Sequence, residues 1–274
     1  MAVDASHRVM TIHLLIFGLG YTATRLAAAV RASGGGVVAC RRQAAPGVLA
    51  FDDPAVGAAM ARATHILSSV PPAADGVDPV LLHYGALLAA AEPRWLGYLS
   101  SIGVYGDAGG AWVDESAPVG SGRRSARAEA DLGWQRLSSA GRVFRLPGIY
   151  GPGRSALDRV RAGTASRIDA PGHLFSRIHV DDIVTAVIAS FERGGPGIYN
   201  LADDEPTLGN VVIEYACDLL GIDWPPLQPL ATATLSPMSR GFYAENRRVS
   251  ALKMQRELGI RLRYPSYRCG LLAC

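Results

Sequence analysis

Lysine is nearly absent from this chain, and long apolar runs are missing altogether. Lys253 is the single lysine among 27 basic residues, so arginine carries almost all of the positive charge. The arginines are dispersed, and a net charge of +3 without any basic run argues against a nucleic-acid partner. No apolar run approaches the roughly 20 residues that a membrane helix needs. The composition is therefore typical of a globular protein with neither a nucleic-acid nor a membrane partner.

Cysteine is also scarce, and its spacing excludes two kinds of site. Cys40, Cys217, Cys269 and Cys274 contain no C-x-x-C pair and have no histidine at zinc-ligand spacing. We therefore expect no metal site, and reduced thiols as in a cytoplasmic protein. Residues 9–17 are short and apolar like a signal-peptide core, but a glycine loop follows them without a small-x-small cleavage site. A buried strand is expected there instead.

Apolar runs alternate with helical stretches over the first 150 residues. Strands are expected at 11–17, 37–40, 48–51, 65–70, 95–100 and 142–146, and helices at 22–32, 79–91 and 125–139, with a further helix ending at 63. This alternation predicts an α/β protein with a doubly wound, Rossmann-type parallel sheet. We expect residues 1–150 to form a dinucleotide-binding domain, to which 174–200 return. Residues 151–274 are expected to form mainly a smaller substrate lobe.

A glycine-rich loop follows the first expected strand. Its sequence GLGYTA, residues 18–23, matches G-x-G-x-x-A at a strand-to-helix turn. Gly18 permits the tight turn and Gly20 lets the backbone approach a pyrophosphate. The N–H groups at the helix start, at Tyr21 and Thr22, are then expected to point at the phosphates. The loop predicts a bound dinucleotide, and an ordinary strand-to-helix turn is the alternative.

The end of the second expected strand lacks the carboxylate that usually holds a free ribose 2′-hydroxyl. The residues after Cys40 are Arg41 and Arg42, two cations that favour a 2′-phosphate. We therefore predict NADP(H) as the cofactor, with NAD(H) as the alternative if both arginines are merely solvated. Asp52 is expected to face the adenine amino group, although a helix-capping role for Asp52 or Asp53 explains it equally well.

Several later segments, read together with the glycine loop, point to a known family. These segments are LSSIGVYG at 99–106, RLPGIYGPG at 145–153, IHVDD at 178–182 and IYNL at 198–201. In this order they resemble the extended short-chain dehydrogenase/reductase superfamily, in particular its NAD(P)-dependent epimerase/dehydratase group and its atypical members. The match extends over residues 11–268. It implies a nicotinamide cofactor and a small-molecule substrate bound beneath the C-terminal lobe.

The resemblance also implies roles for individual residues. Ser101 falls on the family's catalytic serine or threonine, which hydrogen-bonds the reacting oxygen; its alternative role is to cap the segment that follows. The cofactor is expected along Ser68, Val70, Pro71 and Pro147, and the substrate near Tyr150, Arg154, His179 and Arg247. His179 could instead cap a helix. Arg247, with Arg248, either faces an anionic substrate group or is simply solvated.

The family's acid/base pair, Tyr-x-x-x-Lys, is absent. Aligning Asp131 with the acidic residue eight positions after the tyrosine places Arg123 at the tyrosine and Arg127 at the lysine. Arg127 can still hold a ribose hydroxyl, but a guanidinium stays protonated, so Arg123 cannot transfer a proton. Tyr105, four residues after Ser101, is the first substitute that the sequence offers.

Two functions follow from this pattern. The first is an oxidoreductase or epimerase/dehydratase-like enzyme that acts on a hydroxyl or carbonyl of a small polar substrate, such as a sugar derivative, with Tyr105 or water moving the proton. The second is a cofactor-binding sensor or interaction protein with little or no catalysis, which the missing tyrosine motivates. The family also implies a homodimer through the helices at 79–91 and 125–139, although packing on their own sheet explains their apolar faces equally.

Overall fold

A computed structural model of the protein describes residues 11–120, 122 and 125–274. Within this part of the chain the centre is a seven-stranded sheet whose neighbouring strands are all parallel. In spatial order the strands are β12 (Gly197–Asn200), β7 (Gly141–Leu146), β5 (Trp95–Ser101), β4 (His65–Ser68), β1 (His13–Phe17), β2 (Gly36–Arg41) and β3 (Leu49–Ala50). Chain order runs outward from β1 on one side and from β4 on the other. The predicted doubly wound, Rossmann-type fold is confirmed.

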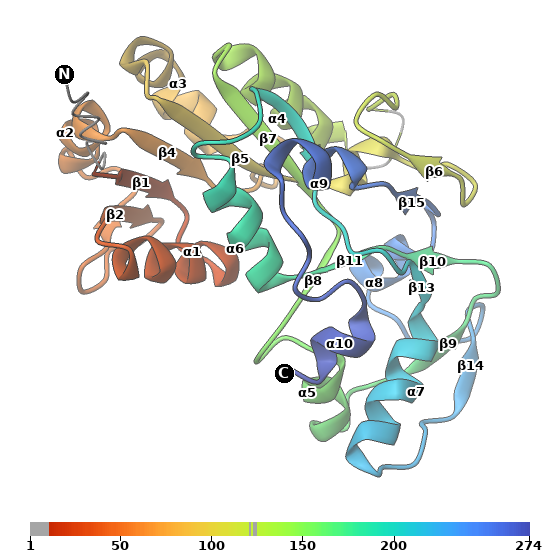
Figure 1. Ribbon diagram of the computed structural model, residues 1–274. Helices are drawn as coiled ribbons and strands as arrows, with labels where there is room; N and C mark the ends of the chain where they lie inside the picture. Colours follow the sequence, from red (N-terminus) through yellow and green to blue (C-terminus); the bar gives the residue numbers. More distant parts are fainter. Residues whose placement is uncertain (1–10, 121, 123–124) are drawn as a thin grey trace, which may run out of the picture.

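Strand alternation divides the apolar side chains between two cores. Leu14 and Ile16 of β1 pack into one core, and Leu15 and Phe17 pack into the other, because successive side chains on a strand point to opposite faces. Helices α1 (Tyr21–Ala32) and α6 (Val180–Ala189) cover the first face, while α2 (Ala55–Arg62), α3 (Pro79–Ala91) and α4 (Ser125–Leu137) cover the second (Figure 1). The near-continuous apolar strands of the sequence are therefore buried on both faces.

A buried aspartate fixes helix α3 against helix α4. The Asp78 Oδ1 atom accepts hydrogen bonds from the N–H groups of Val80, at 2.9 Å, and Leu81, at 3.0 Å, and so caps α3. Its Oδ2 atom accepts a 2.9 Å bond from the Trp134 indole on α4. Leu82 and Leu87 of α3 remain exposed. The homodimer through these two helices stays a prediction.

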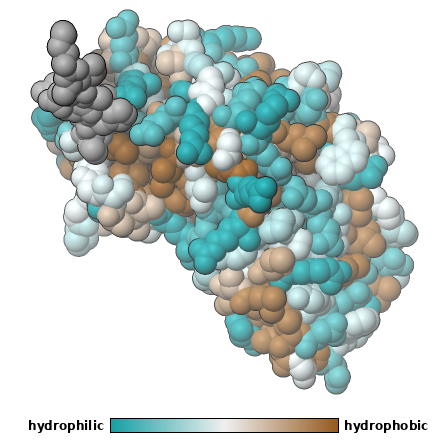
Figure 2. All heavy atoms as spheres, in the orientation of Figure 1, coloured by the Kyte–Doolittle hydropathy of each residue, from teal (hydrophilic) through white to brown (hydrophobic). Residues whose placement is uncertain are grey.

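The lobe beyond the sheet is built from short elements. They are β8 (Gly148–Tyr150), α5 (Ala156–Arg161), β9 (Arg167–Asp169), β10 (Leu174–Phe175), β11 (Arg177–His179), β13 (Thr207–Leu208), α7 (Gly209–Leu220), β14 (Leu227–Pro229), α8 (Pro237–Phe242) and α10 (Tyr267–Leu271). A separate apolar core joins α5, α7 and α10 through Leu157, Ile213 and Tyr267. In Figure 2 apolar side chains gather at the lower end of this lobe, while polar ones dominate the middle of the same face.

The chain crosses between sheet and lobe more than once. The 3-10 helix η1 (Ile102–Tyr105) follows β5, and β6 (Trp112–Val113) pairs with β15 (Arg248–Val249) just before α9 (Leu252–Leu258). Strand β12 lies in the main sheet, inside the segment expected to return there. The exact division into two domains stays a prediction. None of the helices in the described ranges is long and apolar enough to cross a membrane.

Candidate active site

The loop after β1 forms an open cradle at the start of α1. Gly18 has a φ of +84°, and a Cβ atom there would lie 2.9 Å from a methyl group of Val70, so only glycine fits. Gly20 precedes the helix, and a Cβ atom there would meet nothing within 4 Å. Among the described residues no side chain caps this helix. Its free N–H groups therefore face open space, which is the arrangement that binds a pyrophosphate.

Two cavities extend from this cradle along the carboxyl ends of the strands. The wide cavity, of about 1230 Å³, contains Gly18, Arg41, Arg42, Asp52 and Val70 in its wall. The junction cavity, of about 420 Å³, begins at the α1 N-terminus and ends beside β5 and β7. Both are lined by Gly20 and Pro71, so they form one continuous path. Its position, beside the strand ends around β1 and β4, is that of a dinucleotide site at the switch point of the sheet.

Most of the residues predicted to contact the cofactor lie along this path. Tyr21, Thr22 and Pro147 line the junction cavity, and Arg41, Arg42, Asp52, Val70 and Pro71 line the wide one. Asp52 lines the wide cavity. The N-cap of α2 is Pro54, and the preceding Asp53 accepts with its Oδ1 a 2.8 Å bond from the Ala55 N–H.

Ser68 is an exception to that agreement. Its side chain is fully buried, and its Oγ lies 3.4 Å from the Val70 N–H. Ser69 lines both cavities instead, and its hydroxyl donates a 2.6 Å bond to the Gly18 carbonyl. β4 ends at Ser68, whose side chain is buried, and the next residue reaches the cavity walls. Contact between Ser68 and the cofactor stays a prediction.

Ser101 lies where the dinucleotide path meets the lobe. It ends β5 and caps η1, with its Oγ accepting a 3.1 Å bond from the Gly103 N–H. The same residue lines the junction cavity and a further cavity of about 510 Å³ under the lobe, which we call the lobe chamber. Capping uses a lone pair of the hydroxyl oxygen and leaves its hydrogen available as a donor. The structural and catalytic roles of Ser101 are therefore compatible.

Helix α4 places a cation beside this serine. Arg127 lines the junction cavity, and its Nη2 atom lies 3.5 Å from the Leu99 carbonyl. The helix is held by Asp131, which forms a bidentate ion pair with Arg145 of β7 at 2.8 and 3.1 Å. Asp131 also accepts a 2.5 Å bond from Ser100. Arg123, the residue aligned with the missing tyrosine, lies outside the described residues.

Tyr105 occupies the core rather than a cavity wall. Its hydroxyl donates a 2.7 Å bond to Asn200, and the Arg145 guanidinium lies 4.8 Å from its ring centre. Burial raises the pKa of Tyr105. It lines neither the junction cavity nor the lobe chamber. Tyr105 as the proton donor stays a prediction, but this position offers it no direct contact with a substrate beside Ser101.

The lobe chamber has a wall of mixed polarity. Ser101 and Pro147 stand at the end nearest the sheet, and Arg159, Arg177 and Tyr243 stand within the lobe. The wall between them contains apolar side chains, namely Leu146, Ile149, Ile168, Leu174, Phe175, Val212, Ile213, Leu235 and Phe242, together with the polar side chains of Ser166, Ser176, Ser239, Glu245 and Arg247. Such a chamber suits a small molecule that has both apolar and polar parts.

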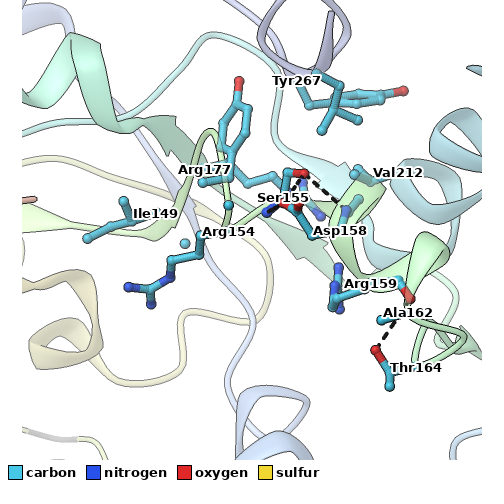
Figure 3. A pocket seen from close by; sticks show the side chains of 15 residues that line it. Ile149, Arg154, Ser155, Asp158, Arg159, Ala162, Thr164, Arg177, Val212 and Tyr267 are labelled. Atoms are coloured by element: carbon cyan, nitrogen blue, oxygen red, sulfur yellow. Dashed lines mark hydrogen bonds between the residues drawn. The ribbon is translucent and has the colours of Figure 1, made fainter. Parts of the chain in front are cut away.

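A fourth, outer cavity of about 550 Å³ adjoins the lobe chamber (Figure 3). Tyr150 lines it, and the Tyr150 hydroxyl donates to the Ser266 carbonyl at 3.3 Å. Arg154 lines the outer cavity, the lobe chamber and the junction cavity alike, with its guanidinium 5.6 Å from the Tyr21 ring centre. Both residues therefore line cavities, and their contact with a substrate stays a prediction.

His179 has a structural position. Its Nδ1 atom accepts a 3.2 Å bond from the Asp181 N–H and so caps α6. The rings of Tyr150 and Tyr264 enclose the imidazole, with centres 5.2 and 4.0 Å away, and it is fully buried. Burial lowers the pKa of His179, so the ring is neutral near pH 7. It lines none of the four cavities, and the capping alternative is the one that the geometry supports.

Arg247 lines the lobe chamber but is engaged by the protein. Its Nη1 atom donates to the Gly106 carbonyl and lies 3.2 Å from Glu245, another residue of the chamber wall. Arg248 is not simply solvated either, because its Nε atom donates a 2.7 Å bond to the Gly110 carbonyl. These arginines join the loop after η1 to the C-terminal segment, which closes one side of the chamber.

Sequence reasoning missed Arg159, Arg177 and Tyr243. One signal was available for Arg159, because Ser155 and Asp158 form a capping box that fixes the start of α5. No local pattern distinguishes Arg177 or Tyr243 from the other arginines and tyrosines of the chain. Only the packing of α5, β11 and α8 brings the three together.

Comparison with solved structures identifies the fold. A human epimerase family protein solved with NADPH has a TM-score of 0.72 at 15% identity, over 94% of this chain and 97% of that one. The protein MoeE5, in complex with UDP-glucose and NAD, has a TM-score of 0.73 at 18% identity, over 95% and 96%. The fold is thus the NAD(P)-binding Rossmann fold of the extended short-chain dehydrogenase/reductases, of the epimerase/dehydratase type. The predicted resemblance is confirmed.

A more similar structure comes from Silicibacter pomeroyi. This conserved protein, described as functionally unknown, is 42% identical, with a TM-score of 0.86 over 94% of this chain and 96% of that one. The chain belongs to the same family as that protein. No protein-family model matches the present chain.

A curated relative adds an activity for comparison. A 3-diazoavenalumate denitrifying reductase from a Streptomyces species is 30% identical over 178 residues. The match covers 58% of this chain and 58% of the relative's own length, so it spans little more than half of each protein.

Proposed function

We propose that this protein is an NAD(P)H-dependent reductase of a small organic molecule. The observation that carries the proposal is the position of Ser101, which lines both the dinucleotide path and the lobe chamber. A substrate in the chamber would therefore meet the cofactor at a hydroxyl donor. Arg41 and Arg42, in the wall of the wide cavity, favour NADP(H) over NAD(H) because a 2′-phosphate would neutralise them.

The residues around the junction divide the work between binding and polarisation. The reduced nicotinamide, when bound, supplies a hydride. Gly20 and the α1 N-terminus hold the pyrophosphate, and Arg127 offers a cation to a ribose hydroxyl. Ser101, fixed by the Gly103 N–H, donates its hydroxyl hydrogen to the reacting oxygen of a carbonyl substrate. Pro147 bounds the site between cofactor and chamber.

Proton transfer is the step for which we assign no side chain. Reduction of a carbonyl takes up one hydride and one proton, and Tyr105 lies in the core. Water entering the chamber is then the proton source. This assignment favours reduction over epimerase or dehydratase chemistry, since those reactions begin with removal of a proton by a positioned base.

The curated relative supports a second substrate class that avoids this difficulty. When a hydride replaces the diazonium group of an aryl diazonium ion, a C–H bond forms, the C–N bond breaks and N₂ is released. The reaction takes up no proton. A site without Tyr-x-x-x-Lys could therefore catalyse this reaction, because no proton donor is needed. The relative is named for denitrifying a diazo compound, and its identity of 30% covers part of the chain.

The first test is the substitution Ser101→Ala. Purified protein is incubated with NADPH and a panel of aldehydes, ketones and an aryl diazonium salt, and loss of the nicotinamide absorbance is followed. With a carbonyl substrate we expect Ser101→Ala to reduce turnover about 10²-fold while NADPH affinity is unchanged. Ser116→Ala, on an exposed loop outside the cavities, is the matched control. Unaltered carbonyl turnover in Ser101→Ala would contradict the role given to the serine.

The same panel separates the enzyme from a cofactor-binding sensor. Tight NADPH binding without oxidation by any compound favours the sensor, which the missing tyrosine motivates. Gly20→Arg should abolish NADPH binding because its side chain would fill the open cradle, whereas Gly57→Arg, at an open position of α2, should not. If NADPH still binds to Gly20→Arg, the cofactor assignment itself is wrong.

A further inference from the structure

Two arginines from different elements meet at the boundary between the lobe chamber and the outer cavity. Arg159 projects from α5 and Arg177 from β11, and each lines both spaces. Figure 3 shows both beside the outer cavity, whereas Arg154 extends away from them on the other side of the loop before α5. Arg177 is fixed in place, because its Nη1 atom donates to the carbonyls of Phe175, at 2.8 Å, and Thr207, at 3.1 Å.

Neither of these guanidiniums forms a salt bridge among the described residues. Burial lowers the pKa of each guanidinium; for Arg177, the nearby Asp203 acts against this effect and the charge of Arg159 adds to it. Burial raises the pKa of Asp203 to about 8. Arg159 is exposed and Arg177 is half-buried, so an anion that joins the two like charges is attracted by both.

The carboxylates in the cavity walls are committed elsewhere. Asp158 accepts hydrogen bonds from the N–H and hydroxyl of Ser155, at 2.7 and 2.6 Å, and lies 3.9 Å from Arg161. Glu245 pairs with Arg247 at 3.2 Å. Neither carboxylate forms a salt bridge with Arg159 or Arg177 within the described ranges. The positive charge at this boundary is thus available to a ligand.

A tyrosine adds a neutral donor to the same place. Tyr243 lines the lobe chamber, and its ring packs edge-on against Phe175 with centres 5.3 Å apart. Its hydroxyl lies within the field of both guanidiniums, which act against the rise that burial produces in the pKa of Tyr243. Two guanidinium forks and a phenol give several N–H and O–H donors around one point, the donor set that holds an oxyanion.

We propose that Arg159, Arg177 and Tyr243 bind an oxyanion of the substrate, a carboxylate or a phosphate, while its reacting group lies at Ser101. Because apolar side chains such as Ile168, Phe175 and Val212 share the chamber wall with these donors, the substrate is a small organic acid whose body packs against them. The proposal rests on the proposed reductase function, since it names the class of molecule that occupies the same chamber.

The test compares an acid with its neutral counterpart. Protein saturated with NADPH is titrated calorimetrically with cinnamate, with cinnamamide and with inorganic phosphate. We expect cinnamate to bind at least about tenfold more tightly than cinnamamide, because charge-assisted hydrogen bonds are lost in the amide. Arg159→Ala should bring the affinity for cinnamate down to that for the amide and leave the amide unchanged. Arg161→Ala, on the same helix but outside the walls of both cavities and paired with Asp158, should change neither.

Two further arms make the outcome decisive. Tyr243→Phe should lower the affinity for cinnamate a few-fold. This variant tests the subsite if Arg177 variants fail to fold after losing their bonds to β10 and β13. Phosphate that competes with cinnamate but not with cinnamamide would locate both anions at this point. If phosphate binds through Arg159 and cinnamate does not bind, the oxyanion is a phosphate ester and the carboxylate is excluded.

Equal affinity for acid and amide, failure of all three probes to bind, or no effect of Arg159→Ala would overturn the oxyanion subsite. Failure of the reductase proposal has a different signature. In that case NADPH does not bind to the wild-type protein, or is never oxidised, whatever the selectivity between cinnamate and cinnamamide.

Discussion

The sheet and the lobe line their cavities with different kinds of groups. Around Gly18 and Gly20 the sheet domain presents backbone N–H groups next to open space. Glycine is needed there because a side chain would occupy that space. In the lobe the polar groups are long side chains, Arg159, Arg177 and Tyr243, that stand on short elements. A backbone cradle suits a cofactor that never changes, whereas side chains on short elements allow the substrate to differ among proteins of one fold.

The two regions also differ in how they bury charge. In the sheet domain Asp131 and Arg145 satisfy each other bidentately at 2.8 and 3.1 Å, with exposures of 0 and 1%. In the lobe Arg177 lies near Asp203, whose carboxyl is held mostly neutral by burial. The first arrangement stabilises the scaffold. The second keeps positive charge free for a ligand at a cost in stability, which is common at functional sites.

The largest effect is expected from Asp131→Asn. The substitution leaves Arg145 buried without its counter-charge, and we expect the free energy of unfolding to fall by about 3–5 kcal/mol. In the lobe Arg167 and Glu214 pair at 2.6 Å but are partly exposed, so Glu214→Gln should cost only about 1 kcal/mol. Urea unfolding of both variants measures the contrast. Equal losses would mean that the two regions bury charge alike.

An intermediate effect is expected from Asp203→Asn, and it should depend on pH. The folded-state pKa of Asp203, about 8, lies above that of an unfolded aspartate, so its stabilising contribution is complete below about pH 4 and is lost as pH rises to 8. Asparagine does not ionise, so the Asp203→Asn variant does not lose stability in this way as the pH rises. The free energy of unfolding of Asp203→Asn, relative to that of wild type, should therefore rise by up to about 4 kcal/mol between pH 5 and pH 8.5.

Thermal unfolding across this pH range measures the difference. Asp204→Asn, at the exposed neighbouring position, is the control and should follow wild type. A constant difference between Asp203→Asn and wild type at all pH values would show that Asp203 is already ionised in the folded protein. The charge of Arg177 would then be compensated internally.

The smallest effect is expected at the far end of the cofactor path. Replacing Arg41 and Arg42 with alanine should lower the affinity for NADPH about tenfold and leave the affinity for NADH unchanged, because only NADPH carries a 2′-phosphate. Fluorescence titration with each nucleotide measures this ratio, and Arg62→Ala, exposed at the end of α2, is the control. A parallel loss for both nucleotides would assign the arginines to the shared part of the cofactor.

The sequence was sufficient wherever structure and function depend on neighbours in the chain. Strand and helix positions followed from apolar alternation, and the cradle followed from the glycines at 18 and 20. Ser101 was named from the resemblance of its strand-end segment to the family; it lines two cavities, and its catalytic role stays a prediction. These features are local, because a strand, a tight turn and a helix start are each set by a few consecutive residues.

Tertiary packing decided which side chains reach the site. Ser69 rather than Ser68 faces the cofactor path, and Tyr105 is turned into the core by its bond to Asn200. The oxyanion donors in the lobe come from segments more than 80 residues apart, between Arg159 and Tyr243. Thus the sequence alone determined the fold class and the cradle, through local periodicity and glycine conformation. Only the packing of distant elements decided where the charge of the substrate lobe converges, because no local pattern encodes a meeting of distant residues.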